Sequence, residues 1–151
     1  MEKPFYNFKA SNDSTWFEFE SVSEEKTIQK VIAFYPTDDI EIYQLIFGDL
    51  QSDGKINIIS KSNNRDMALV LTTVIQTIHL FFERFPSKTV IFTGSTVVRT
   101  RLYRVAISKM LNEIGEYYEI IGFTEDGNIE QFVSNTAYYA YSIKRKYANS
   151  I

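Results

Sequence analysis

Four β-forming segments, joined by short polar turns, precede the first helical pattern of this chain, and their order constrains the fold more than any other feature. The segments are rich in β-branched and aromatic residues, which favour strands. They cover residues 15–22, 27–35, 40–47 and 55–60. Pro36 ends the second segment, and Asp53-Gly54 suits the turn of a β-hairpin. Because strands joined by short turns pair as neighbours, these segments predict an antiparallel β-meander.

Two helical patterns follow the meander. In the first, apolar residues recur at helical spacing over residues 67–85, and Pro86 lies just past the end. Asn63 or Asn64 can cap the start of this helix, and Asp66 in its first turn suits the helix dipole. The second helical pattern covers residues 96–116.

Short β-forming segments surround the second helical pattern. They cover residues 89–93, 117–124, 128–134 and 137–147. Asp126-Gly127 suits the turn of a C-terminal β-hairpin. With 151 residues, 44% of them apolar, the chain is long enough for one well-packed core. We therefore expect a single α+β domain over residues 1–151, in which an antiparallel meander is packed by two long helices, with a further strand between them and a C-terminal hairpin.

The composition narrows the possible chemistry. The chain has no cysteine and one histidine, His79, which excludes thiol catalysis and cysteine metal sites and argues against a Ser-His relay. No cofactor and no metal are therefore expected. The N-terminus lacks the apolar segment of a secretory signal, and the hydrophobic run over residues 67–82 is too polar and too short to span a membrane. These features predict a soluble, cytoplasmic protein without membrane contact.

The charge is unevenly distributed along the chain. Residues 1–54 carry 11 acidic and 4 basic side chains, a net charge of −7, whereas residues 55–151 carry 8 acidic and 12 basic ones, a net charge of +4. A protein that binds nucleic acid over its whole surface would be basic. Any phosphate contact is therefore expected in a local patch, and the alternative is that these charges are scattered over solvated faces.

The strongest candidate for a binding site lies between the strand at 89–93 and the second helix. A Gly-Ser-Thr turn precedes the helix, whose free backbone N–H groups attract anions. Three arginines follow within ten residues, and guanidinium groups bind phosphate and carboxylate in a fixed geometry. We expect a phosphate- or carboxylate-binding corner formed by Gly94, Ser95, Thr96, Arg99, Arg101, Tyr103 and Arg104.

A helical wheel separates the three arginines of this corner. Arg99 falls on the core-facing arc, one turn from Tyr103, whereas Arg101 and Arg104 fall on the solvent-facing side. A guanidinium on the core-facing arc needs a partner, because an unpaired buried charge costs several kcal/mol. That partner is either a ligand anion or a carboxylate of the chain itself, such as Asp49.

Each part of the corner also has a purely structural interpretation. Ser95 or Thr96 can serve only as the helix N-cap, and Arg99 can form an internal ion pair with Asp49 or Glu119. Auxiliary phosphate contacts can come from the basic tail, if it folds near the start of the second helix. The tail residues are Lys144, Arg145 and Lys146.

The corner also carries a resemblance. The segments Thr93-Gly94-Ser95-Thr96 and Arg99-Thr100-Arg101-Leu102-Tyr103-Arg104 resemble the signature of a family of small uncharacterised bacterial proteins, a domain of unknown function. Further matches are Tyr43 and Phe47-Gly48-Asp49. The resemblance covers nearly the whole chain and implies family membership without an established activity.

A weaker resemblance is architectural. Four meandering strands followed by one long helix are similar to the repeat unit of the Pur-alpha and Whirly single-stranded nucleic-acid-binding proteins. The second half of this chain departs from that repeat, since it reads strand, helix, hairpin and strand. Because a fold does not determine a function, this similarity serves as an analogy.

Three functions are compatible with these patterns. The first is a binding module for a phosphate-rich partner, single-stranded nucleic acid ahead of others. The second is an enzyme or a sensor for a small phosphorylated or carboxylated ligand, in which Asp49 would serve as general base. The third is a structural or interaction protein without a ligand site. The sequence leaves the oligomeric state and the presence of catalysis open.

Overall fold

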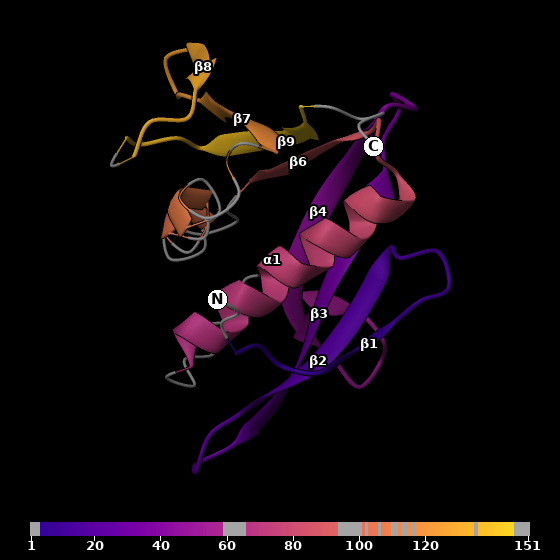
Figure 1. The fold of residues 1–151 in the computed structure, drawn as a ribbon. Helices are drawn as coiled ribbons and strands as arrows, with labels where there is room; N and C mark the ends of the chain where they lie inside the picture. Colours follow the sequence, from indigo (N-terminus) through magenta and orange to yellow (C-terminus); the bar gives the residue numbers. More distant parts are fainter. Residues whose placement is uncertain are drawn as a thin grey trace.

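The computed structural model describes most of the chain. The described residues are 4–58, 66–93, 101, 103–105, 107–109, 112, 115, 117–134 and 136–146. They form an α+β fold in which one large, mostly antiparallel sheet of nine strands packs against helices (Figure 1). The fold class expected from the sequence is therefore correct at this level.

The strands pair in the order β1-β2-β3-β4-β6-β9-β7-β8, and β5 pairs with β4 beside this path. Their bounds are β1 Phe8–Ala10, β2 Trp16–Val22, β3 Thr27–Pro36, β4 Ile42–Leu50, β5 Ile56–Asn57, β6 Thr89–Thr93, β7 Tyr118–Phe123, β8 Ile129–Gln131 and β9 Ala140–Arg145. Only β4 and β6 run parallel among the pairs of described strands. The two halves of the chain thus join at the middle of one continuous sheet.

The meander predicted for the N-terminal half is confirmed for β2, β3 and β4, which pair as antiparallel neighbours. The fourth predicted strand is represented by the two residues of β5, which pair with the end of β4. Two features were not predicted. The short edge strand β1 precedes the meander, and β9 inserts between β6 and the β7–β8 hairpin.

Helix α1, Met67–Arg84, lies across the sheet in front of β3 and β4 (Figure 1). Its C-terminal end follows the prediction, since Phe85 caps it by donating its N–H to the Phe81 carbonyl and Pro86 follows. The start differs from the prediction. Asp66 occupies the N-cap position, yet its carboxylate accepts hydrogen bonds from the hydroxyls of Tyr6 and Ser21 instead of capping the helix. Asn63 and Asn64 lie outside the described residues.

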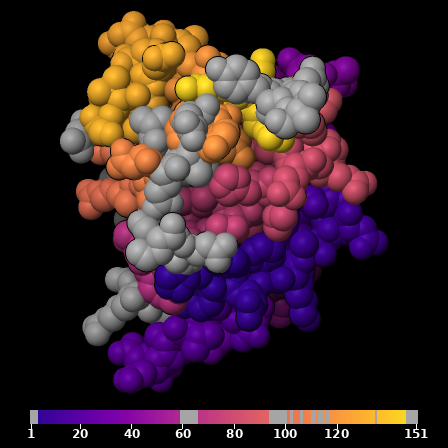
Figure 2. Space-filling model, in the orientation of Figure 1, coloured from indigo at the N-terminus to yellow at the C-terminus, as the bar shows by residue number. Residues whose placement is uncertain are grey.

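The hydrophobic core lies between α1 and the sheet. Phe81 of α1 is fully buried, and its ring centroid lies 4.5 Å from that of Phe34 on β3 and 5.1 Å from that of Tyr43 on β4. The other side of α1 reaches the surface between the N-terminal and C-terminal strands (Figure 2). Among the described residues, no helix is long and apolar enough to cross a membrane.

Part of the second helical pattern is helical in the structure. The described helical positions are 101, 103–105, 107–109 and 112. Tyr103 and Ile107 belong to the same buried cluster as α1, so both helical segments cover one face of the sheet. The ends of this helix, and hence its expected length, lie outside the described residues.

Candidate functional site

The structure describes only part of the predicted anion-binding corner. Gly94, Ser95, Thr96 and Arg99 lie outside the described residues, so their predicted roles stay predictions. Arg101 is exposed, as the helical wheel predicts. The two corner residues whose contacts the structure defines are Tyr103 and Arg104 on the second helix.

Tyr103 fixes where the second helix meets the sheet. Its side chain is 5% exposed, and its ring centroid lies 5.0 Å from that of Phe92 on β6. The Phe92 ring in turn stacks on Tyr141 of β9, with centroids 5.4 Å apart. The core-facing position predicted for Tyr103 is therefore correct, and the helix packs over the β6–β9 pair.

Arg104 does not follow the helical-wheel prediction. It is half-buried, and its Nε atom is inaccessible to solvent. The guanidinium lies close enough to the Tyr141 hydroxyl to act on its pKa. The physical reason is the length of the side chain, because an arginine beside the core-facing arc can lay its apolar stem against the protein and bring its charged end back toward the sheet.

Two hydrogen-bonding atoms at this position lack a partner with good hydrogen-bond geometry among the described residues, although the Arg104 guanidinium and the Tyr141 hydroxyl lie next to each other. They are the Nε of Arg104 and the hydroxyl oxygen of Tyr141, whose side chain is fully buried. Leaving a buried polar group unsatisfied costs about 1–3 kcal/mol. Unsatisfied buried polar atoms are rare in folded proteins. A ligand that supplies a hydrogen-bond acceptor would explain the two found here.

The protonation state of Tyr141 makes it a donor. Burial raises the pKa of its hydroxyl, and the Arg104 side chain offsets only part of that increase, first as a hydrogen-bonding neighbour and then through its positive charge. The phenol therefore stays neutral at physiological pH and keeps its proton. A guanidinium N–H and a phenol O–H thus meet beside the rings of Phe92 and Tyr103, where water is largely excluded.

The neighbouring Tyr138 shows the opposite situation. Its hydroxyl accepts a hydrogen bond from the Val133 N–H and donates one to the Glu130 carboxylate, both at 3.1 Å. Its ring packs flat on Gly122, where a Cβ atom would lie 2.5 Å from the Tyr138 ring. Tyr138 is thus a satisfied structural tyrosine, 5.9 Å from Tyr141 between ring centroids.

The basic tail lies at the other end of β6 from this corner. Lys144 on β9 pairs with Thr89, the first residue of β6, whereas Ala140 pairs with Thr93 at the end that leads to the corner. Lys144 and Lys146 are exposed, and Arg145 donates a hydrogen bond to the Phe82 carbonyl of α1 at 3.3 Å. Four residues of strand separate the tail from the corner by about 13 Å.

Asp49 already has a basic partner in the chain. Its carboxylate lies 2.5 Å from the Nζ of Lys30, its register neighbour on β3, and the Lys30 and Asp49 side chains are 6% and 16% exposed. The Lys30 ammonium also lies 5.8 Å from the centre of the Phe47 ring. The sequence did not point to Lys30, because a single lysine in a β-forming run normally faces solvent.

His79 on α1 is half-buried, and its Nδ1 lies 3.0 Å from the hydroxyl of Tyr118 on β7. Burial lowers the pKa of His79 and raises the pKa of Tyr118 to about 12. Both side chains therefore stay neutral at physiological pH. The packing role that the sequence favours for His79 agrees with this position, and the hydrogen bond ties α1 to the C-terminal strands.

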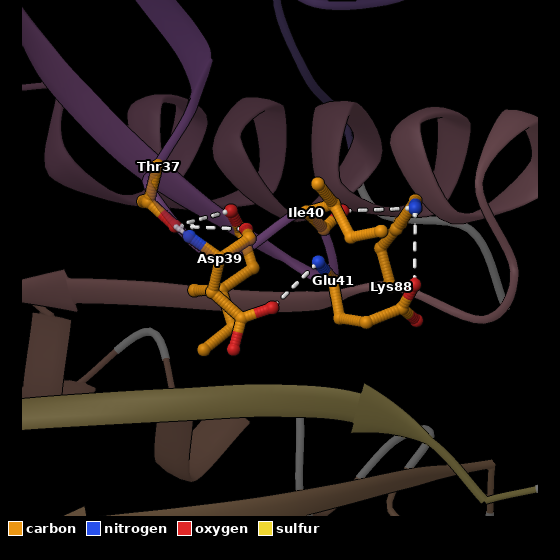
Figure 3. Close-up of polar contacts among 6 residues, drawn as sticks. Thr37, Asp39, Ile40, Glu41 and Lys88 are labelled. Carbon is orange, nitrogen blue, oxygen red and sulfur yellow. Dashed lines mark hydrogen bonds and ion pairs between the residues drawn. The ribbon is translucent and has the colours of Figure 1, made fainter.

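The turn between β3 and β4, which carries Asp38, Asp39 and Glu41, is held together by internal hydrogen bonds and by Lys88 (Figure 3). The Thr37 hydroxyl donates to the carbonyls of Asp39 and Ile42, and Lys88 pairs with Glu41 at 3.4 Å. Among the described residues, no group of three or more His, Cys, Asp or Glu side chains could hold a metal ion. Asp39 also accepts a hydrogen bond from the Glu41 N–H at 2.9 Å, so Asp39 and Glu41 help to shape the turn.

Comparison with known proteins agrees with the family expected from the sequence. The model of DUF6934, a family of unknown function, matches residues 2–146, so the chain belongs to this family. No curated protein and no solved structure matches the chain.

Proposed function

We propose that this protein binds an anionic group, carboxylate or phosphate, between Arg104 and Tyr141. The observation that carries the proposal is that two adjacent buried donors, the Arg104 Nε and the Tyr141 hydroxyl, lack an acceptor among the described residues. An oxygen anion satisfies both at once. Hydrogen bonds in which one partner is charged are about twice as strong as neutral ones, and a low dielectric strengthens them further.

A small ligand is better supported than single-stranded nucleic acid. Nucleic-acid binding needs a continuous basic surface that tracks several phosphates. The exposed Lys144 and Lys146 lie at the end of β6 away from the corner, and the two donors are buried. A compact anion needs only the buried pair of donors.

Binding is also better supported than catalysis. An enzyme at this corner would use Asp49 as its general base, and that carboxylate is held by Lys30. The nearest satisfied tyrosine, Tyr138, uses its hydroxyl for Glu130 and Val133. The described groups around Arg104 therefore fit recognition of an anion.

The proposal predicts a ligand-dependent thermal shift that requires Arg104. Sodium phosphate, sodium acetate and a single-stranded oligonucleotide are each added at constant ionic strength, and the melting temperature is measured. At 100 times its Kd, a ligand stabilises the native state by about 2.7 kcal/mol, which raises Tm by roughly 5–10 °C for a chain of this size. Arg104→Met is expected to abolish the shift.

Arg101→Met is the matched control, because Arg101 is an exposed arginine on the same helix. It should keep the shift of the wild type. An equal shift in Arg104→Met, or no shift with any of the three probes, would refute the proposed function. A shift with the oligonucleotide alone that disappears with added salt would support nucleic-acid binding in its place.

A further inference from the structure

His79 and Tyr118 form a polar contact between the second half of α1 and the C-terminal strands. The His79 Nδ1 lies 3.0 Å from the Tyr118 hydroxyl on β7, and the two ring centroids are 5.6 Å apart. Phe82 of α1 packs on the Tyr118 ring, and its carbonyl accepts a hydrogen bond from Arg145 of β9. Helix α1 and the strands β7 and β9 therefore meet around one imidazole (Figure 1).

The hydroxyl of Tyr118 is the donor in this hydrogen bond. Tyr118 is 4% exposed, and its hydroxyl makes no other hydrogen bond with the described residues. Its buried proton is satisfied by donation to His79, and leaving such a group unsatisfied would be costly. The imidazole is then neutral, with Nδ1 as the acceptor and its own proton on Nε2.

Protonation of His79 removes this acceptor. A charged imidazole carries hydrogen on both nitrogens, so Nδ1 would face the Tyr118 hydroxyl as a donor. The hydroxyl would then accept a hydrogen bond, and its own proton would lose its acceptor in a position that water barely reaches. The charged ring would also be half-buried, and burial disfavours the charged form. Acid therefore weakens the contact between α1 and β7.

Charged groups from three elements lie around His79 in the described part of the chain. Glu83 is exposed one turn further along α1, and Arg145 lies on β9. On the second helix, Lys109 donates a hydrogen bond to Thr72, which lies two turns before His79, about 10 Å along the axis of α1. Burial lowers the pKa of His79 most, Glu83 raises it by a smaller amount, and Arg145 lowers it further. The resulting pKa lies below the ordinary value of 6.5.

We propose that this contact is acid-sensitive, and that protonation of His79 loosens the packing of the second half of α1 on β7 and β9. Because folding lowers the pKa of His79, its contribution to stability is complete above pH 6.5 and is lost as the pH falls toward the folded-state pKa. His79 is the one histidine of the chain, and no other side chain present has its ordinary pKa between 5 and 8. Asp13 and Asp126, whose pKa values are lowered from 3.8, titrate below this window.

An NMR titration of the wild type tests the state of the imidazole, because a single histidine gives a single set of ring signals. The expected midpoint lies below pH 6.5, and the ring nitrogen shifts above the midpoint should place the proton on Nε2. Glu83→Gln should lower the midpoint further, since it removes an acid that favours the charged ring. A wild-type midpoint at or above 6.5, or a proton on Nδ1 in the neutral ring, would overturn the proposal.

Amide hydrogen exchange tests the loosening of α1 itself. His79→Gln is the matched variant, because the glutamine carbonyl can accept the Tyr118 proton and does not titrate. Between pH 7.5 and 5.5, the protection factors of residues 75–84 should fall at least about threefold more in the wild type than in His79→Gln. Circular dichroism at both pH values confirms that each protein is folded. An equal change in the two proteins would refute the proposal. The measurement needs no ligand, so its outcome is independent of anion binding.

Discussion

Replacing Asp49 by alanine is expected to lower the free energy of unfolding by about 3–5 kcal/mol. The reason is that the substitution removes the carboxylate that pairs with the buried ammonium of Lys30. The Lys30 ammonium lies 2.5 Å from the Asp49 carboxylate, and its side chain is 6% exposed on the face of the sheet covered by α1. Losing the carboxylate removes an ion-pair partner from a lysine that has little access to water. Urea denaturation of the wild type and the variant measures the difference.

The double variant Lys30→Met with Asp49→Leu separates the cost of removing one member of the ion pair from the net contribution of the pair. Replacing both members of a buried ion pair by apolar residues is often nearly neutral, because their desolvation cost disappears with them. The double variant should therefore recover most of the stability lost in Asp49→Ala. If Asp49→Ala costs less than about 1 kcal/mol, the ion pair is not buried as described.

Phe81→Ala is expected to destabilise the protein by about 3–5 kcal/mol as well, by a different mechanism. Phe81 is fully buried at the centre of the core, where it joins α1 to β3 through Phe34 and to β4 through Tyr43. Removing its ring loses buried apolar area and leaves a cavity that the surrounding rigid strands cannot fill. Thermal and urea denaturation both report the loss.

Phe5→Ala is the matched control for that core substitution. It removes the same atoms from a side chain that is 39% exposed near the N-terminus. Its cost should stay well below that of Phe81→Ala, since Phe5 keeps a large part of its surface in water whereas Phe81 is fully buried. Equal losses in Phe5→Ala and Phe81→Ala would contradict the packing of α1 on the meander.

The sequence predicts the local elements well because their signals are local. Asp53-Gly54 and Asp126-Gly127 were assigned to hairpin turns, and both glycines adopt a positive φ, 85° and 95°, that other residues rarely take. The strand predicted at residues 89–93 has those bounds in the structure. Turn chemistry and the distribution of β-forming residues were sufficient in each case.

The order of the strands depends on contacts between distant parts of the chain, which local patterns do not encode. The parallel pair β4–β6 joins Ile42 to Thr89 across α1, and β9 then inserts between β6 and β7. The alternation of residues 137–147 is weak, so the sequence predicts a strand there without indicating its neighbours. The edge strand β1 has only three residues and no clear pattern.

In the candidate site, too, the features that depend on local sequence were predicted, and those that depend on contacts between distant segments were not. The position of Tyr103 follows from the helical wheel, because its ring packs where the helical repeat directs it. The wheel failed for Arg104, whose long side chain reaches around the helix. Tyr141 was missed, because its unpartnered hydroxyl becomes visible only once β9 lies beside β6. A pattern of residue types cannot show which buried donor lacks an acceptor.

Arg104 and Tyr141 place two buried hydrogen-bond donors side by side without a well-aligned acceptor among the described residues. Comparing the stabilities of Tyr141→Phe and Tyr138→Phe by urea denaturation tests this claim most directly. Tyr138→Phe should cost about 1–3 kcal/mol, because it leaves the Val133 N–H and the Glu130 carboxylate without their partner. The Tyr141 hydroxyl lies beside the Arg104 guanidinium and has no partner with good hydrogen-bond geometry among the described residues, so in the absence of ligand Tyr141→Phe should leave the stability unchanged or raise it. A loss for Tyr141→Phe as large as that for Tyr138→Phe would mean that the protein already satisfies this hydroxyl, and would contradict the site.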